Sequence, residues 1–412
     1  MPEAFILDAA RTPRGIGKPG KGALSALHPQ RLLATVLRAL RERNDLDTRE
    51  VDDTFVGCSV QIGKQASCVG RMAVLDAGWD VAAPAVTLDR FCGSGITAVN
   101  LAAANILSGM ADLCVAGGVE MMSYTGSIER PGGVATLDQG NLHLREIHPQ
   151  PHQGICADMI ATLEGFTRED VDRIGLISQQ RAQTAIAEGR FDASLVPVHH
   201  DDGRLALDHE EFPRPGTTME TLSGLPTVFD RFMDQPIDAT GETFDQLVKR
   251  AYPDLAIRHV HHAGNSSGVV DGAAGLVLAS GEYAERKGLR PRARVRAIAT
   301  VAGSPTLMLN EPVPAARKVL AKAGMTTDDI DLFEVNEAFA AVALKFIRDL
   351  ELDDAKVNVN GGSIALGHPI AATGAILIGT ALDELERRGL GTALVTMCTG
   401  GGMAPAIVIE RV

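Results

Sequence analysis

Short apolar stretches rich in β-branched residues alternate with helix-like segments along this chain, and glycines cluster where the apolar stretches end. Buried strands are expected at residues 5–10, 53–58, 85–88, 113–116, 330–333 and 393–396, and helices at 29–43, 93–108 and 168–188. Strands that are apolar throughout and alternate with helices are typical of sheets covered on both faces. The sequence therefore predicts an α/β fold with largely parallel or mixed sheets.

Two distant segments share one pattern, which suggests an internal duplication. Residues 92–120 and 367–403 each contain a glycine-flanked reactive side chain, a helix of small residues, a glycine stop, a buried strand and a double glycine. The pattern predicts two similar α/β halves.

Residues 123–262 lack regular strand signals and carry turn-rich runs such as HPQPHQG. This middle part is predicted to be an inserted subdomain that faces the substrate.

Composition excludes several classes of protein. The net charge is −13, with no basic run, so the chain is a poor candidate for binding nucleic acid. The six cysteines show no CxxC pairing and predict reduced thiols in a cytoplasmic protein. No uninterrupted apolar run is long enough to span a membrane, and the N-terminal residues show no targeting signal.

Cys92 is a candidate nucleophile. It lies in RFCGSG, between a predicted strand and the start of a predicted helix. The positive end of the helix dipole favours the thiolate, which is the reactive form of cysteine. From position alone, a buried structural cysteine is an equally good interpretation.

Two further motifs place reactive side chains at the ends of predicted elements. His368, between Gly367 and a proline, is suited to act as a general base, although from position alone a polar loop histidine is the commoner interpretation. Cys398 precedes three glycines whose bare N–H groups could stabilise an oxyanion; a tight turn beside a core cysteine is the alternative. Asn336 and Glu337 follow the predicted strand at 330–333 and are polar site candidates, or helix caps.

Two weaker motifs compete with this interpretation. The run GIGKPGKG at 15–22 matches a phosphate-binding loop up to Lys21, but glycine then stands where a serine or threonine should bind magnesium. The run HVHH contains His259, His261 and His262, with no carboxylate or cysteine at metal-ligand spacing. We therefore expect no metal site.

Taken together, these segments resemble the thiolase family of acyl-CoA acyltransferases. The resemblance covers essentially the whole chain, through AARTPRG at 9–15, RFCGSG, AGGVEMMS at 116–123, AGNSSGVVDGAAG at 263–275, NEAF at 336–339, GGSIALGHPIAATGA and CTGGGMAPA at 398–406. It implies two similar halves with mixed sheets in αβαβα layers and an inserted loop domain. The implied units are residues 1–122 with 263–283, 123–262, and 284–412, assembled as a homodimer or homotetramer.

The resemblance also implies a two-step transfer. Cys92 would take the acyl group from a thioester with His368 as its base, and Cys398 would move the proton at the α-carbon of acetyl-CoA. Asn336, through a water, and His368 would hold the oxygen of the acetyl-CoA that becomes the nucleophile. The N–H groups of Cys92 and Gly400 would hold the acyl-enzyme oxygen. The reaction is thiolytic cleavage of 3-ketoacyl-CoA, Claisen condensation of acetyl-CoA with acyl-CoA, or both.

Coenzyme A thioesters would be the substrates, and the resemblance implies no other cofactor. The positions that match the family's substrate and coenzyme A contacts are Ser267, Arg214, Thr221, His152, Gln153, Ala263 and Phe339.

Departures from the family's pattern leave the acyl-chain preference open. Gln153 stands where biosynthetic members commonly have methionine, and the segment 229–263 is markedly longer than usual.

Two rival functions remain open from the sequence. A non-catalytic acyl-CoA-binding protein could share the fold, although such a protein would be expected to have lost a reactive residue. A ketoacyl synthase would call for a second catalytic histidine where Asn336 stands.

Overall fold

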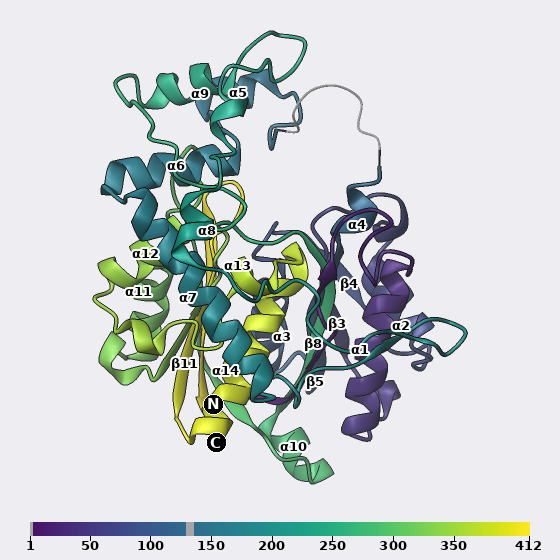
Figure 1. The fold of residues 1–412 in the computed structure, drawn as a ribbon. Coiled ribbons are helices and arrows are strands. Elements are labelled where there is room, and N and C mark those ends of the chain that lie inside the picture. The colour runs from purple at the N-terminus through teal and green to yellow at the C-terminus, as the bar shows by residue number, and fades with distance from the viewer. Residues whose placement is uncertain (1–2, 129–135) are drawn as a thin grey trace.

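The computed structural model describes residues 3–128 and 136–412 (Figure 1). Its strands are β1 (Ala4–Arg11), β2 (Gly15–Ile16), β3 (Asp53–Gly57), β4 (Val86–Leu88), β5 (Leu113–Met121), β6 (Val198–His199), β7 (Leu205–Leu207), β8 (Val270–Ser280), β9 (Ala293–Ala302), β10 (Leu332–Val335), β11 (Thr392–Thr396) and β12 (Met403–Arg411). Its α-helices are α1 (Pro29–Arg43), α2 (Val69–Asp76), α3 (Ser94–Leu107), α4 (Met122–Thr125), α5 (Leu142–Ile147), α6 (Gln153–Glu164), α7 (Arg168–Ala187), α8 (Met219–Ser223), α9 (Phe244–Ala251), α10 (Gly281–Lys287), α11 (Pro312–Ala323), α12 (Ala340–Asp349), α13 (Ser363–Leu366) and α14 (Thr373–Arg388).

The main sheet contains two sets of four strands with the same order and direction. In the first set β3 is parallel to β5, and β8 is antiparallel to its neighbours β5 and β1. In the second set β10 is parallel to β11, and β12 is antiparallel to its neighbours β11 and β9. A short antiparallel contact between β1 and β9 joins the sets. The repeated order confirms the prediction of two similar α/β halves.

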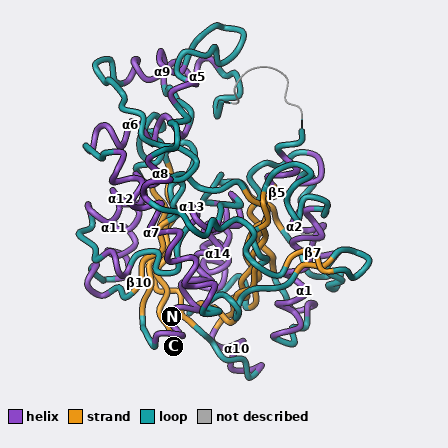
Figure 2. Tube along the Cα trace, viewed as in Figure 1, coloured by secondary structure: helices purple, strands orange, loops and turns teal. Residues whose placement is uncertain are grey.

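The helices and the two parts of the sheet form five layers (Figure 1). Helices α3 and α14 lie in the middle and contact strands of both sets, within one apolar cluster that includes Ile96 and Ile376. Helix α1 covers the outer face of the first set, and α11 covers the outer face of the second. Figure 2 shows the two groups of strands with helices between and around them. The predicted αβαβα fold class is therefore confirmed.

The two central helices begin in direct backbone contact. A Cβ atom on Gly374 would lie 2.3 Å from the backbone nitrogen of Ile96, and one on Gly95 would lie 2.8 Å from the carbonyl oxygen of Ala371. Cys92 stands two residues before α3, and His368 stands five residues before α14. The crossing therefore determines where both of these side chains stand.

Several strand predictions were wrong in their limits. Strand β5 continues through Gly117 and Gly118 to Met121, so the double glycine does not end it. A Cβ on Gly118 would lie 2.3 Å from the carbonyl oxygen of Ala371, so glycine allows a close approach there. Strand β10 lies two residues later than predicted. Strands β8, β9 and β12 were missed; β8 is rich in glycine and alanine, which have low strand propensity.

The middle part of the chain contains helices α4 to α9, joined by long loops, and one short β6–β7 hairpin. The long segment 229–263 forms α9, which lies near α5 at the top of Figure 1. Phe244 and Leu247 of α9 share a small apolar cluster with Ile155 and Met159 of α6. The limits of the three predicted units stay predictions.

The glycine-rich run and the helices test two further expectations from the sequence. The glycine-rich run at 15–22 does not lead into a helix, because β2 pairs with β8 and α1 begins only at Pro29. Within residues 3–128 and 136–412, no helix is both long enough and apolar enough to cross a membrane.

The crossing of α3 and α14 predicts the effect of a single methyl group. Gly374→Ala should destabilise the protein by about 2 kcal/mol, because the new Cβ would overlap the backbone at Ile96. Gly224→Ala is the control, since a Cβ there meets its nearest neighbour at an ordinary 3.6 Å. Denaturant unfolding followed by circular dichroism would measure both changes. Equal stability of the two variants would contradict the proposed crossing.

Candidate active site

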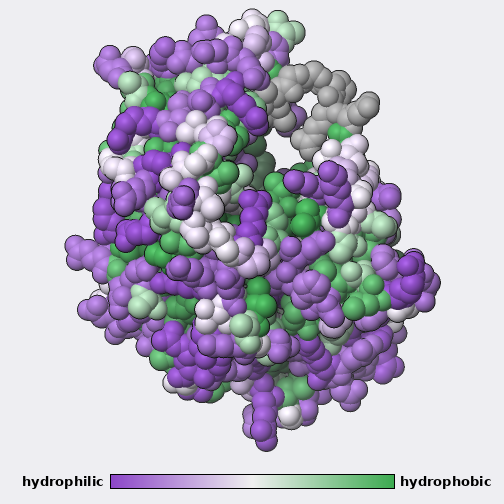
Figure 3. All heavy atoms as spheres, in the orientation of Figure 1, coloured by the Kyte–Doolittle hydropathy of each residue, from purple (hydrophilic) through white to green (hydrophobic). Residues whose placement is uncertain are grey.

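A cavity of about 200 Å³ opens beside Cys92 and beneath the inserted part of the chain. Its lining consists of Ser59, Phe91, Cys92, Thr136, Leu137, Gln150, Pro151, His152, Gln153, Phe244, Met308, Ile370 and Gly400. On the face drawn in Figure 3, hydrophobic residues are visible in a hollow below α5 and α9, while hydrophilic residues cover most of the remaining surface.

Cys92 stands on a tightly held turn before α3. The preceding residue, Phe91, has φ +46°, which is a costly conformation for a residue with a side chain. Two hydrogen bonds hold it there: the Phe91 N–H donates to Asp89 Oδ1 (2.6 Å), and Ser94 Oγ donates to the Phe91 carbonyl (2.6 Å). The turn fixes the direction in which the thiol points.

A second loop, from the other half of the molecule, packs directly on this turn. A Cβ on Gly93 would lie 2.7 Å from Thr399 Oγ1, and one on Gly400 would lie 3.0 Å from the Phe91 ring. Cys398 consequently stands within electrostatic range of Cys92, and this proximity adds to desolvation in raising the pKa of the Cys398 thiol. The structure thus brings together two cysteines that are far apart in sequence.

His368 and Asn336 form a second group of polar side chains. Asn336 Nδ2 lies 3.4 Å from His368 Nε2, and the other ring nitrogen lies 2.6 Å from Thr373 Oγ1. Ser363 Oγ donates to Asn336 Oδ1 at 2.5 Å. Thr373 and Ser363 therefore fix the orientation of the imidazole and the amide.

Burial determines the charge states of the site. Desolvation raises the pKa of Cys92 to about 12, although the backbone N–H groups of Cys92 and Gly400 oppose the shift. Desolvation also raises the pKa of Cys398 and lowers that of His368 to about 4. The N–H groups near the helix start do favour the Cys92 thiolate, but loss of water has the larger effect on its pKa.

These charge states limit what the site can do chemically. The directions of these shifts favour protonated thiols and an uncharged imidazole at neutral pH. A thiol must lose its proton before it can attack a carbonyl, so a base has to accept that proton as the bond forms. The N–H groups of Cys92 and Gly400 remain available for a negative oxygen formed next to the sulfur.

A second cavity, of about 180 Å³, gathers three of the predicted coenzyme A contacts. Arg214, Thr221 and Ala263 line it. The rest of its lining is Gln179, Thr217, Leu222, Leu225, Gly264 and Ile364. The guanidinium of Arg214 lies 5.2 Å from the centre of the Phe212 ring and remains exposed.

Of the other predicted contacts, two line the first cavity and two line neither cavity. His152 and Gln153 line the cavity beside Cys92. The Phe339 ring is buried, edge-on to Phe229 at 5.6 Å. Ser267 belongs to neither lining; its N–H donates to the Ala338 carbonyl (3.0 Å).

Two sequence interpretations need correction. Glu337 is a buried structural carboxylate that accepts from Ser178 Oγ (2.6 Å) and Asn358 Nδ2 (3.0 Å). The HVHH run does have carboxylate partners, contributed by α6 and α7 rather than by nearby sequence. Within the described residues, no group of three or more histidine, cysteine or acidic side chains is arranged to hold a metal ion.

Sequence reasoning missed most of the apolar lining of the first cavity. Phe91 lies in the quoted RFCGSG motif but was not singled out, Met308 lies in no quoted motif, and Phe244 lies in the segment that departs from the family's pattern. Thr373 and Ser363 stand within the quoted motif around His368, five residues to either side, and that spacing could have identified them.

The fold consists of two similar halves in five layers, and glycine-rich turns position the two cysteines. These features define a class of protein in which a thiol can carry a transferred group. Comparison with known proteins identifies the family. The description "Thiolase, N-terminal domain" matches residues 4–232, and "Thiolase, C-terminal domain" matches residues 289–411. The chain belongs to the thiolase family and is an acyl-CoA thiolase, an acyltransferase.

Similar proteins cover the whole chain. It is 39% identical to steroid 3-ketoacyl-CoA thiolase FadA6 of Mycobacterium tuberculosis, over 100% of this chain and 95% of the relative. It is 40% identical to beta-ketoadipyl-CoA thiolase of Pseudomonas aeruginosa, over 100% and 99% of the two chains. The crystal structure of Bacillus anthracis acetyl-CoA acetyltransferase superposes with a TM-score of 0.83 at 33% identity, over 100% and 99%. None of these similarities favours a non-catalytic protein or a ketoacyl synthase.

The charge states predict how Cys92 reacts with an alkylating agent. If His368 takes the thiol proton, His368→Asn should slow iodoacetamide labelling of Cys92 at neutral pH by about a hundredfold. Cys68 is an exposed free thiol in the same chain and should label at an unchanged rate. Peptide mass spectrometry over time would follow both. Unchanged labelling of Cys92 in the variant would show that His368 is not its base.

Proposed function

We propose that Cys92 carries the acyl group, with His368 as the base that prepares it. The observation that carries this proposal is the Cys92 thiol at the wall of a cavity, with the N–H groups of Cys92 and Gly400 directed at its sulfur. In the first step the Cys92 proton passes to His368 while sulfur bonds to the thioester carbon. The carbon–sulfur bond to coenzyme A then breaks, and the departing thiolate takes the proton from His368.

Cys398 and Asn336 would act in the second step. Cys398 removes a proton from the α-carbon of acetyl-CoA in condensation, or returns it in cleavage. The oxygen of the resulting enolate needs donors, and the Asn336 amide, through a water, and the His368 imidazole supply them; their 3.4 Å contact supports this role. Using two thiols for two carbon centres separates the half-reactions, which predicts ping-pong kinetics.

Coenzyme A would occupy the second cavity, where Arg214 offers a positive group beside Thr221 and Ala263. An anionic nucleotide fits an exposed arginine on an otherwise acidic chain. We propose that coenzyme A thioesters are the substrates and that the reaction needs no further cofactor. His152, Gln153, Phe339 and Ser267 would complete the path between the two cavities.

We propose a neutral, largely apolar acyl group as the substrate of the cavity beside Cys92. The described lining contains no lysine or arginine, and its walls include Phe91, Leu137, Phe244 and Met308. A free terminal carboxylate, as in a 3-ketoadipyl group, would lose its hydration there without gaining a cation. Phe244 comes from the long segment 229–263, so this insertion would set the depth available to the acyl chain.

The assembly would be a homodimer or a homotetramer in the cytoplasm. Strand β4 ends the sheet and exposes Val86, while α3 exposes Leu101 and Leu107 nearby in the first half. An edge strand with exposed apolar neighbours is suited to pairing with a second copy, and closed two-fold symmetry is the common outcome.

Two serine variants separate the proposed half-reactions. Acetyl-CoA should leave an acetyl group on Cys92 of the unmodified enzyme, and Cys92→Ser should lose both the adduct and turnover. Cys398→Ser should still form the adduct but condense acetyl groups about a thousandfold more slowly. Intact-mass spectrometry and a turnover assay would measure the two steps. Full turnover in Cys92→Ser would rule out the proposed nucleophile.

The acyl cavity predicts a shift in chain-length preference. Phe244→Ala should raise kcat/KM for longer 3-ketoacyl-CoA relative to acetoacetyl-CoA by about tenfold, because the ring bounds the cavity. Leu247→Ala is the matched control: Leu247 shares the same apolar cluster but does not line the cavity. Assays over a series of chain lengths would test this. The same shift in both variants would attribute the effect to a general loosening of α9.

A further inference from the structure

Two adjacent buried histidines each contact a buried carboxylate from a different helix. His261 Nδ1 lies 2.7 Å from Asp158 Oδ1, and His262 Nε2 lies 2.7 Å from Asp172 Oδ1. Asp158 belongs to α6 and Asp172 to α7, and all four side chains are at most 1% exposed. The thiolase reaction proposed above uses none of these four residues.

Hydrogen bonds to the backbone fix the tautomer of each ring. His261 Nε2 accepts from the Ala341 N–H (3.3 Å), so its proton is on Nδ1 and is donated to Asp158. His262 Nδ1 accepts from the Gly264 N–H (3.0 Å), so its proton is on Nε2 and is donated to Asp172. The neighbours are therefore opposite tautomers, and each connects a carboxylate to one backbone N–H group.

These contacts leave no ring nitrogen of the two imidazoles free to bind another partner. Every ring nitrogen is already engaged, so neither ring has a free lone pair for a metal ion. Protonation of either ring would place an imidazole N–H against a backbone N–H, with no acceptor between them. The geometry points instead to positioning.

His261 holds the start of α12. Ala341 is the second residue of that helix, and the preceding Phe339 provides no side-chain cap for its free N–H groups. The His261 ring also meets the Phe339 ring edge-on at 5.7 Å. Asn336 lies on the loop that enters the helix, so His261 and Asp158 determine where this loop ends.

The backbone next to His261 strengthens the same attachment. The Ala340 N–H donates to the Asn265 carbonyl, and the Ser267 N–H donates to the Ala338 carbonyl, both at 3.0 Å. The His368 N–H donates to the Gly268 carbonyl at 2.8 Å. The segment 261–268 thus contacts both of the loops that carry Asn336 and His368.

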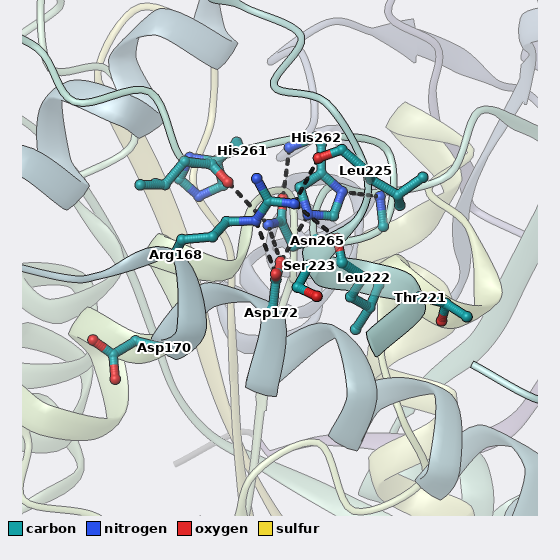
Figure 4. A network of polar contacts seen from close by, with 12 residues as sticks. Arg168, Asp170, Asp172, Thr221, Leu222, Ser223, Leu225, His261, His262 and Asn265 are labelled. Atoms are coloured by element: carbon teal, nitrogen blue, oxygen red, sulfur yellow. Dashed lines mark hydrogen bonds and ion pairs between the residues drawn. The ribbon is translucent and has the colours of Figure 1, made fainter. Parts of the chain in front are cut away.

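Asp172 connects His262 to the second cavity (Figure 4). Its carboxylate accepts from Arg168 Nε (2.8 Å), and Arg168 Nη2 donates to the carbonyl oxygens of Leu222 and Leu225, both at 2.7 Å. These two leucines line the second cavity together with Gly264, the residue bonded to His262. His262 and Asp172 therefore hold two walls of that cavity.

We propose that His261 and His262 are positioning residues with separate duties. His261, with Asp158, sets the loop of Asn336 and so affects the bond-making step. His262, with Asp172 and Arg168, sets the cavity assigned to coenzyme A and so affects substrate binding. The inference rests on the proposed function, which assigns those roles to the loop and the cavity.

The test uses substitutions that retain the carboxylate contact and remove the backbone contact. In His261→Asn the amide nitrogen can replace Nδ1 towards Asp158, but no atom reaches Ala341. In His262→Gln the amide nitrogen can replace Nε2 towards Asp172, but the acceptor for Gly264 is lost. His209→Gln is the matched control, because His209 and Asp208 form an exposed pair on the surface.

Steady-state thiolysis with varied coenzyme A gives the first readout. His261→Asn should lower kcat about tenfold or more with little change in the KM for coenzyme A. His262→Gln should raise that KM about tenfold with little change in kcat. His261→Gln, whose oxygen can reach the Ala341 N–H, should recover part of the lost kcat. His209→Gln should match the unmodified enzyme.

Calorimetric titration with free coenzyme A gives the second readout, which does not depend on turnover. Binding should weaken in His262→Gln and not in His261→Asn. Equal loss of kcat and binding in both variants, or no loss in either, would overturn the division of duties. An unmodified enzyme that binds coenzyme A without turnover would instead refute the proposed function, and the binding comparison would still test His262.

Discussion

The backbone crossing of α3 and α14 is the contact on which the rest of the structure depends. Glycines at 95 and 374 let the two helix starts approach to a separation that any side chain would prevent. Each helix belongs to a different half, and each begins shortly after a reactive side chain, Cys92 or His368. Close packing in the middle layer thus brings the chemistry of two distant sequence segments to one place.

Burial of that place has an electrostatic consequence. Close packing removes water from the two thiols and from the imidazole, so the neutral forms of Cys92, Cys398 and His368 are favoured at neutral pH. Charge then arises only when a proton is transferred during reaction. The N–H groups of Cys92 and Gly400 already point to where a negative charge would form, so little reorganisation is needed.

The inserted part of the chain contributes side chains that surround this centre. Its helices α6 and α7 contribute the carboxylates that hold His261 and His262, and its helix α9 contributes Phe244 to the wall beside Cys92. The duplicated halves therefore carry Cys92, His368 and Cys398, and the insertion shapes the cavity beside Cys92 and holds His261 and His262.

The sequence by itself determined the α/β class and the duplication, and it singled out the candidate reactive residues, because these depend on local patterns: apolar strands, helix periodicity and glycine-flanked Cys92, His368 and Cys398. It could not find β8, since a strand of glycine and alanine is specified by its neighbours rather than by its own propensity. Nor could it show how far burial raises the pKa of Cys92, because desolvation depends on every atom that surrounds the sulfur. Only the tertiary structure paired the HVHH run with Asp158 and Asp172, which lie about a hundred residues away in sequence. Contacts of that separation leave no periodic signal in a single chain, so they are decided by how the layers pack.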